Sequence, residues 1–171
     1  MPASPPPIPS PAPSAKGAAP ADTQLRIRAA LLDNLFSLVL VIVVVGSVGY
    51  SLAQLEGNHP ARSPNDDLPV LYYLIVFAGL TFTTVATYFG LTVSSAKHAT
   101  WGQRIAGLEV VDDQTGATPS KGQAWSWGLL QAFTRCSGLG LVAYLPILSH
   151  PRRQSLLDSL THLRVVHRNK E

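Results

Sequence analysis

No charged side chain occurs between Asp33 and Glu56, and this uncharged run of 22 residues limits what the chain can fold into. As a helix it would span roughly 33 Å, which is enough to cross the hydrocarbon core of a bilayer, about 30 Å thick. A second uncharged run covers residues 68–96. In lipid, only helices and closed barrels satisfy the backbone polar groups, and two runs cannot close a barrel. We therefore expect two transmembrane helices.

The composition agrees with a membrane protein and excludes several classes of site. Charged residues make up 13% of the chain and hydrophobic residues 46%, whereas soluble domains carry about 25% charged residues. The single cysteine, Cys136, excludes an internal disulfide, a four-thiolate metal site and a C-x-x-C redox pair. The sequence also lacks a phosphate-binding glycine loop and a nucleophile elbow. We expect no enzyme activity, no metal or other cofactor and no nucleic-acid partner. The expected partners are the lipid bilayer and a second copy of the chain or another membrane protein.

Residues 1–22 differ in kind from the rest of the chain. Eight of the 14 prolines lie in this stretch, together with alanine and serine. Such a composition buries too little apolar surface to offset the entropy lost on ordering, so we expect a disordered tail ahead of a membrane domain over residues 25–167. The start of the chain has no basic region followed by an unbroken apolar stretch, so we expect the first span to be retained rather than cleaved as a signal peptide.

Lysine and arginine are distributed unevenly around the two spans. They precede the first span, follow the second and recur near the C-terminus, whereas the loop over residues 56–67 contains only Arg62. The positive-inside rule therefore places the N-terminus and residues 97–121 in the cytoplasm and the loop outside. We expect the protein in the cytoplasmic (inner) membrane of a bacterium. The three tryptophans are expected near the cytoplasmic interface: Trp101, Trp125 and Trp127.

A third apolar segment, residues 124–149, does not resolve into a simple span. Arg135 divides it, and Gly138, Gly140 and Pro146 loosen its second half. Its large apolar residues contribute roughly −4 to −5 kcal/mol to insertion, while one central arginine costs about +3 kcal/mol and the polar residues add further costs, so the sum is close to zero. The segment is either a single span or a bent hairpin that returns to the cytoplasmic side. We favour the hairpin, because it keeps the basic C-terminal residues inside.

Two short apolar pieces near the membrane segments have the pattern of strands. Residues 108–117 run from alternating apolar positions into a turn that contains Gly116, and residues 163–166 offer a matching apolar piece. We expect the two to pair at the cytoplasmic surface. The expected fold class is an all-α membrane protein with two transmembrane helices, a third hydrophobic segment and a small cytoplasmic strand-turn element.

Two aspartates and several arginines are the candidates for function. Arg26 and Asp33 are seven positions apart, so on a helix they share a face, with the carboxylate about 10 Å farther along the axis. Asp33 would lie just inside the bilayer, where a carboxylate is costly unless it is paired, hydrated or protonated; a shallower position would make it only an anchor for the helix end. If the tail returns to the cytoplasmic face, Asp158 can reach Arg26 or Arg104 and form an ion-paired cluster, either functional or a structural staple. Arg104 and Arg135 are secondary candidates.

Three separated blocks, in the right order, resemble the RDD family of small integral membrane proteins: residues 26–33, 100–112 and 153–158. The resemblance extends over about residues 25–167 and leaves out the proline-rich tail. The family is named for one arginine and two aspartates, and the resemblance implies that these are Arg26, Asp33 and Asp158. Arg28 is a less well spaced candidate for the arginine.

The chain departs from the family pattern at two places. Trp127 and Gly128 stand where members often have an arginine, and Leu157 stands where they often have a histidine. The second departure argues against a proton relay that needs a histidine beside Asp158. The resemblance implies transport of ions or small solutes. In that hypothesis we expect Asp33 to be the titrating group and Arg26 to set its pKa. The alternative is a membrane scaffold or assembly module, in which the same residues hold the fold.

Overall fold

The computed structural model describes residues 20–56, 68–149 and 154–168. Most of the predicted tail and the loop that contains Arg62 lie outside these ranges. Residues 20–22 of the predicted tail are among the described residues. Pro20 forms a β-bridge with Val166, and the backbone N–H of Ala21 donates to the carbonyl of Val165 at 3.1 Å. The backbone before the first helix is therefore held by the end of the chain.

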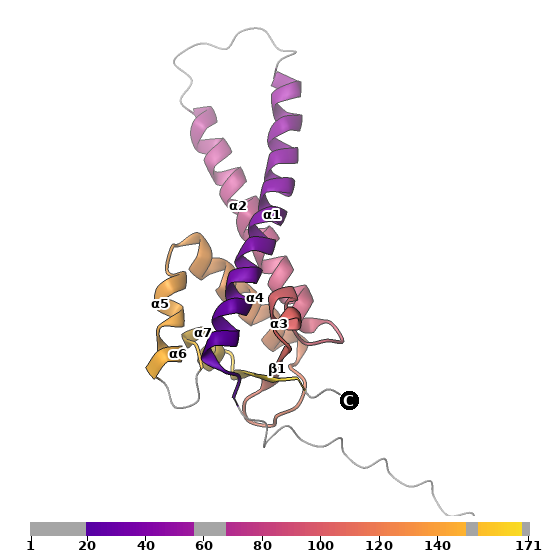
Figure 1. Cartoon of the computed structure of the whole chain (residues 1–171). Coiled ribbons are helices and arrows are strands. Elements are labelled where there is room, and N and C mark those ends of the chain that lie inside the picture. The colour runs from indigo at the N-terminus through magenta and orange to yellow at the C-terminus, as the bar shows by residue number, and fades with distance from the viewer. Residues whose placement is uncertain (1–19, 57–67, 150–153, 169–171) are drawn as a thin grey trace, which may run out of the picture.

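The two predicted spans are long helices, α1 (Thr23–Glu56) and α2 (Leu68–Ser94). Both are long and apolar enough to cross a membrane, and only 6% and 11% of their most apolar stretches are buried within the chain. A core helix of a soluble protein would be covered by its neighbours, so these exposed apolar surfaces fit a lipid environment. Figure 1 shows that the far halves of the two helices diverge and stand clear of the other elements.

The remaining elements gather around the other halves of the two helices (Figure 1). A short helix, α3 (Trp101–Ile105), packs on α1, and the longer α4 (Lys121–Cys136) packs along α2. Each begins with a capping box, from Thr100 and Ser120, in which side chains satisfy backbone donors that a helix start leaves without partners. The shared core of the fold is made of large buried side chains from several elements: Phe89, Val93, Leu108, Trp127, Leu157 and Leu163.

Helices α2 and α4 meet through small residues. A Cβ on Gly128 would lie 2.6 Å from the backbone N of Gly90 and 2.9 Å from the carbonyl O of Ala86, so only glycine permits this approach. The Ala86-x-x-x-Gly90 spacing is therefore a helix-contact face, as the small-residue pattern indicates for membrane helices.

The third apolar segment is bent. Helix α4 ends at Cys136, and Gly138 adopts a φ of +75°. Three short helices follow: α5 (Gly140–Tyr144), α6 (Pro146–Ser149) and α7 (Leu156–Leu160). Glycine accepts this left-handed conformation at little cost, which explains why the helix stops here. The segment leads back to the N-terminal end of α1, where α7 lies (Figure 1).

The two strand-like pieces form an antiparallel pair, β1 (Leu108–Asp112) and β2 (Leu163–His167). In its register Leu108 lies opposite His167 and Asp112 opposite Leu163. Both strands contribute buried side chains to the shared core. Helix α7 precedes β2 in the chain, so the strand pair helps to fix its position.

Candidate functional site

Arg26 and Asp158 form a buried ion pair. The guanidinium Nη2 of Arg26, in the first turns of α1, donates to Oδ2 of Asp158 in α7. Their residues are 7% and 1% exposed, so both charges are almost fully removed from solvent. A buried charge is tolerated only when it is paired and its remaining hydrogen-bonding capacity is filled.

Two further donors occupy the Asp158 carboxylate. The indole Nε1 of Trp127 donates to Oδ1 at 3.1 Å, and the backbone N–H of Ser155 donates to Oδ2 at 3.0 Å. In return the hydroxyl of Ser155 accepts from the backbone N–H of Asp158 at 3.1 Å, which completes a capping box at the start of α7. Asp158 thus joins α1, α4 and α7 through a single carboxylate.

Asp33 is held by a second set of donors. Its Oδ1 accepts from the hydroxyl of Tyr88 and from the backbone N–H of Gly102, both at 2.8 Å, and its Oδ2 accepts from the hydroxyl of Thr100 at 2.6 Å. Asp33 is 4% exposed. Within the described ranges all its hydrogen-bond donors are uncharged, and they come from α2 and from the start of α3.

Gly102 allows α3 to approach α1 closely enough for this contact. A Cβ there would lie 2.2 Å from the carbonyl O of Ala29 and 2.8 Å from Cγ of Asp33. Such distances exclude any side chain, so the glycine is required for its backbone N–H to reach the carboxylate.

Of the two arginines that Asp158 was expected to reach, it pairs with Arg26 and not with Arg104. Arg26 and Asp33 do share a helix face, but Arg26 pairs with Asp158, while Asp33 is satisfied by neutral donors. The reason is distance along the helix axis, since the two residues are about 10 Å apart along it. Arg28 is exposed and lies outside both clusters, which favours Arg26 as the signature arginine.

Arg104 and Arg135, the secondary candidates, have separate roles. Arg104 donates from Nε to the carbonyl of Ala99 and from Nη2 to the hydroxyl of Ser95, both at 2.8 Å, and so ties α3 to the end of α2. It does not take part in the pairing with Asp158. Arg135 is considered with the larger pocket below.

Asp112 organises the turn between β1 and α4. Its Oδ2 accepts from the side-chain amide of Gln123 at 2.6 Å, and its Oδ1 accepts from the backbone N–H groups of Gln114 and Thr115. The hydrogen bond from Gln123 is the largest of the effects that lower the pKa of Asp112, to about 2. The carboxylate therefore remains ionised and keeps this turn closed.

The sequence interpretation missed several partners of the two aspartates. We expect Trp127 at the membrane interface, but its residue is only 3% exposed. The departure from the family pattern at this position does not predict its hydrogen bond to Asp158. Tyr88 had no signal beyond its place in an apolar run. Thr100 and Gly102 lie in a block that carried the resemblance, and this was the one available signal.

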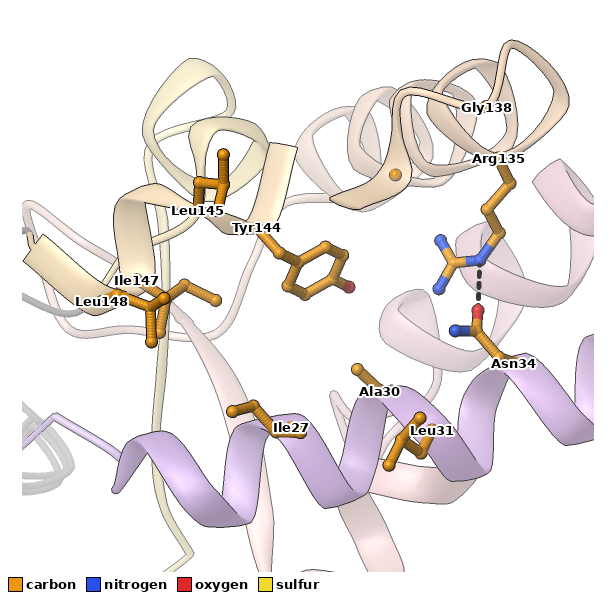
Figure 2. A pocket seen from close by; sticks show the side chains of 11 residues that line it. Ile27, Ala30, Leu31, Asn34, Arg135, Gly138, Tyr144, Leu145, Ile147 and Leu148 are labelled. Atoms are coloured by element: carbon orange, nitrogen blue, oxygen red, sulfur yellow. Dashed lines mark hydrogen bonds between the residues drawn. The ribbon is translucent and has the colours of Figure 1, made fainter. Parts of the chain in front are cut away.

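Two cavities lie beside these clusters. The smaller, of about 20 Å³, lies between them and is lined by Arg26, Asp33, Gln103, Tyr144 and Asp158, among others. Such a volume accommodates roughly one water molecule. The larger, of about 510 Å³, lies between α1 and the α4–α6 segment and has mostly apolar walls, with Arg135 and Asn34 at one end (Figure 2).

Comparison with known proteins gives one match. The model of the RDD family matches residues 20–162, which cover most of the chain, including both aspartate clusters. No curated protein and no solved structure matches the chain.

Proposed function

The chain belongs to the RDD family, and on that premise we propose that it is a membrane scaffold module whose signature residues clamp its segments together. It catalyses no reaction and works within the bilayer with a second copy of itself or another membrane protein. One observation carries this proposal: every oxygen of the two signature carboxylates accepts hydrogen bonds from other segments of the same chain.

The distribution of these donors supports a clamping role. Asp158 joins the return segment to α1 and α4, and Asp33 joins α1 to α2 and α3. A carboxylate that binds a transported cation must give up some of the hydrogen bonds that it accepts. Both aspartates accept theirs from buried donors, and those donors would be left without a partner at a cost in free energy.

The same contacts support a membrane arrangement. Arg26 lies in the first turns of α1, and its partner Asp158 follows the bent third segment, so the C-terminal strand lies at the same end of α1 as the N-terminus. This geometry favours a hairpin that returns to the cytoplasmic side of the inner membrane, with both termini inside. A reporter fused after residue 171 is expected to show cytoplasmic location, and an extracellular signal would overturn the arrangement.

The clamp is tested by Asp158→Asn. Loss of one partner of a buried ion pair costs about 3–5 kcal/mol, so the folded amount recovered from membranes should fall sharply. Glu109→Gln is the matched control, because among the described residues the carboxylate of Glu109 accepts no hydrogen bond and forms no ion pair. Normal abundance of Asp158→Asn, measured by size-exclusion chromatography in detergent, would contradict the proposal.

Transport of ions or small solutes is the second candidate. It is favoured by the small cavity, whose walls include Asp33, Asp158 and Arg26 and which has room for about one water between two acids. Cation-dependent proton flux in proteoliposomes that is lost in Asp33→Asn would support transport. Equal flux in the variant and the wild type would show that Asp33 does not exchange protons during transport. Absence of flux in the wild type would rule out transport and favour the scaffold function.

A further inference from the structure

We propose that the larger pocket binds a long-chain carboxylate taken from the membrane, with its head on Arg135 and its alkyl chain against the apolar wall. The pocket is bounded by α1 on one side and by the end of α4 with α5 and α6 on the other (Figure 2). Ala30 and Tyr144 line both this pocket and the smaller cavity, but Arg135 forms no hydrogen bond with either aspartate among the described residues.

At the polar end of the pocket, Arg135 has a nitrogen that can donate a hydrogen bond to a ligand. Arg135 donates from Nε to the side-chain oxygen of Asn34 at 2.9 Å and from Nη1 to the side-chain oxygen of Gln131. Within the described ranges its Nη2 makes no hydrogen bond, and it is not among the buried polar atoms that lack a partner. Figure 2 shows the terminal nitrogens of the guanidinium directed into the space between the helices.

Tyr144 adds a second donor. Its hydroxyl accepts from the side-chain amide of Gln131 at 3.4 Å, which leaves the hydroxyl proton available. In Figure 2 the hydroxyl points toward Arg135, so both groups face the same part of the pocket.

The positive charge of Arg135 has no ion-pair partner among the described residues. No carboxylate of the described residues lies within ion-pair distance of its guanidinium, and its face lies 4.2 Å from the ring centroid of Phe89. A cation beside an aromatic ring and in a membrane protein is stabilised by an anionic partner, and a carboxylate matches the planar guanidinium.

The rest of the pocket suits an alkyl chain. Its apolar wall is formed by side chains from α1 and from the α5–α6 segment: Ile27, Leu31, Leu145, Ile147 and Leu148. Leu31 and Leu148 are 64% and 70% exposed, so the entrance is itself apolar and a ligand dissolved in lipid can enter from the side. The volume of about 510 Å³ is within the range of small-ligand pockets. Arg135 already donates from Nε to Asn34 and from Nη1 to Gln131, so its remaining donor capacity matches one carboxylate on a single alkyl chain.

The test measures binding of radiolabelled palmitate to the full chain in phosphatidylcholine nanodiscs. We expect saturable binding at one molecule per chain, weakened about 10- to 100-fold in Arg135→Gln, since a hydrogen bond between charged groups is lost. Arg28→Gln is the matched control, because it removes an exposed positive charge from α1, which forms one side of the pocket, at a residue that does not line the pocket. It should bind as the wild type does.

Two further measurements test ligand binding even if Arg135→Gln folds poorly. Ala30→Phe fills the pocket from α1 and leaves Arg135 in place, so it should abolish saturable binding. Hexadecanol, with the same chain and no charge, should compete with palmitate about 10- to 100-fold less well on the wild type. Non-saturable uptake that is equal in all variants would overturn the proposal. Displacement of the labelled palmitate by a lower concentration of phosphatidylglycerol than of unlabelled palmitate would show that the site prefers a lipid phosphate and would overturn the carboxylate as its ligand.

Discussion

The indole Nε1 of Trp127 lies 3.1 Å from Oδ1 of Asp158 and donates a hydrogen bond to it. Trp127 is in α4, and Asp158 is in α7, beyond the bend at Gly138. The third apolar segment is therefore joined to its own continuation at the same carboxylate that binds Arg26 of α1. An arginine in place of Trp127 would add charge at this point, whereas the indole adds a neutral donor and a large apolar surface.

Replacement of Trp127 by phenylalanine tests the value of this donor. The ring would still pack edge-on against Phe89, whose centroid is 5.6 Å away, but Asp158 would lose one hydrogen bond in a buried site. We expect the free energy of unfolding to fall by about 1–3 kcal/mol. A lower thermal midpoint in detergent, followed by circular dichroism, would measure it. Trp101→Phe is the control, because Trp101 is 53% exposed; equal effects of the two substitutions would contradict the prediction.

Gly102→Ala is expected to separate α3 from α1. The added Cβ would lie 2.2 Å from the carbonyl O of Ala29, so the helices must move apart and the backbone N–H of residue 102 must leave Asp33. Overpacking of this kind costs about 1–3 kcal/mol, to which the lost hydrogen bond adds about 1–3 kcal/mol. Thermal unfolding in detergent checks the sum.

Gly122→Ala provides the opposite expectation. The nearest atom to a Cβ there is Oγ of Ser120 at 3.9 Å, so alanine fits in α4 without displacement. Alanine in a helix is favoured over glycine by roughly 0.5–1 kcal/mol, so this variant should be slightly more stable. A destabilised Gly122→Ala together with a neutral Gly102→Ala would show that the close approach at α3 is not limiting.

The turn at Asp112 predicts a pH dependence. Its pKa is lowered from 3.8 to about 2, first of all by the hydrogen bond from Gln123. The folded chain therefore binds fewer protons here than the unfolded chain between these two values, so this contribution to stability is present above pH 3.8 and is lost as the pH falls through about 2. Gln123→Ala should move the pKa of Asp112 back toward 3.8, as a carboxyl NMR titration would measure.

Gln114→Ala is the control for that titration. Gln114 donates to Asp112 through its backbone N–H at 3.0 Å, which the substitution retains. The pKa of Asp112 should then stay low. An unchanged pKa in Gln123→Ala would show that the turn holds the carboxylate without the amide.

The helices and the strand pair follow from local patterns, whereas the site depends on contacts between distant elements. Uncharged runs identify α1 and α2 because the length of a span is set by the bilayer. Gly138 marks the bend because only its backbone accepts a positive φ easily. The donors to Asp33 come from residues 55 to 69 positions away, and their approach is set by how α2 and α3 pack on α1. Spacing along α1 places Arg26 and Asp33 on one face about 10 Å apart along the axis, so it does not identify the donors to Asp33.

The last prediction separates the charge of Asp33 from its shape. In Asp33→Asn the side-chain oxygen can still accept from Tyr88 and Gly102, and the amide can donate to the hydroxyl of Thr100, which can act as an acceptor. We expect this variant to keep most of its stability. Asp33→Leu leaves all three donors buried without a partner, at about 1–3 kcal/mol each, and should not accumulate as folded protein.

Thermal unfolding of the two variants in the same detergent, with recovery from membranes as a second measurement, decides between a structural acceptor and a required charge. Asp33→Asn close to the wild type and Asp33→Leu unfolded would identify Asp33 as an acceptor whose negative charge the fold does not need. A folded Asp33→Asn is also what makes the flux experiment interpretable, because lost flux then cannot come from lost protein. If Asp33→Asn is as unstable as Asp33→Leu, the ionised carboxylate itself holds α2 and α3 on α1, and proton exchange at this residue would disrupt the fold.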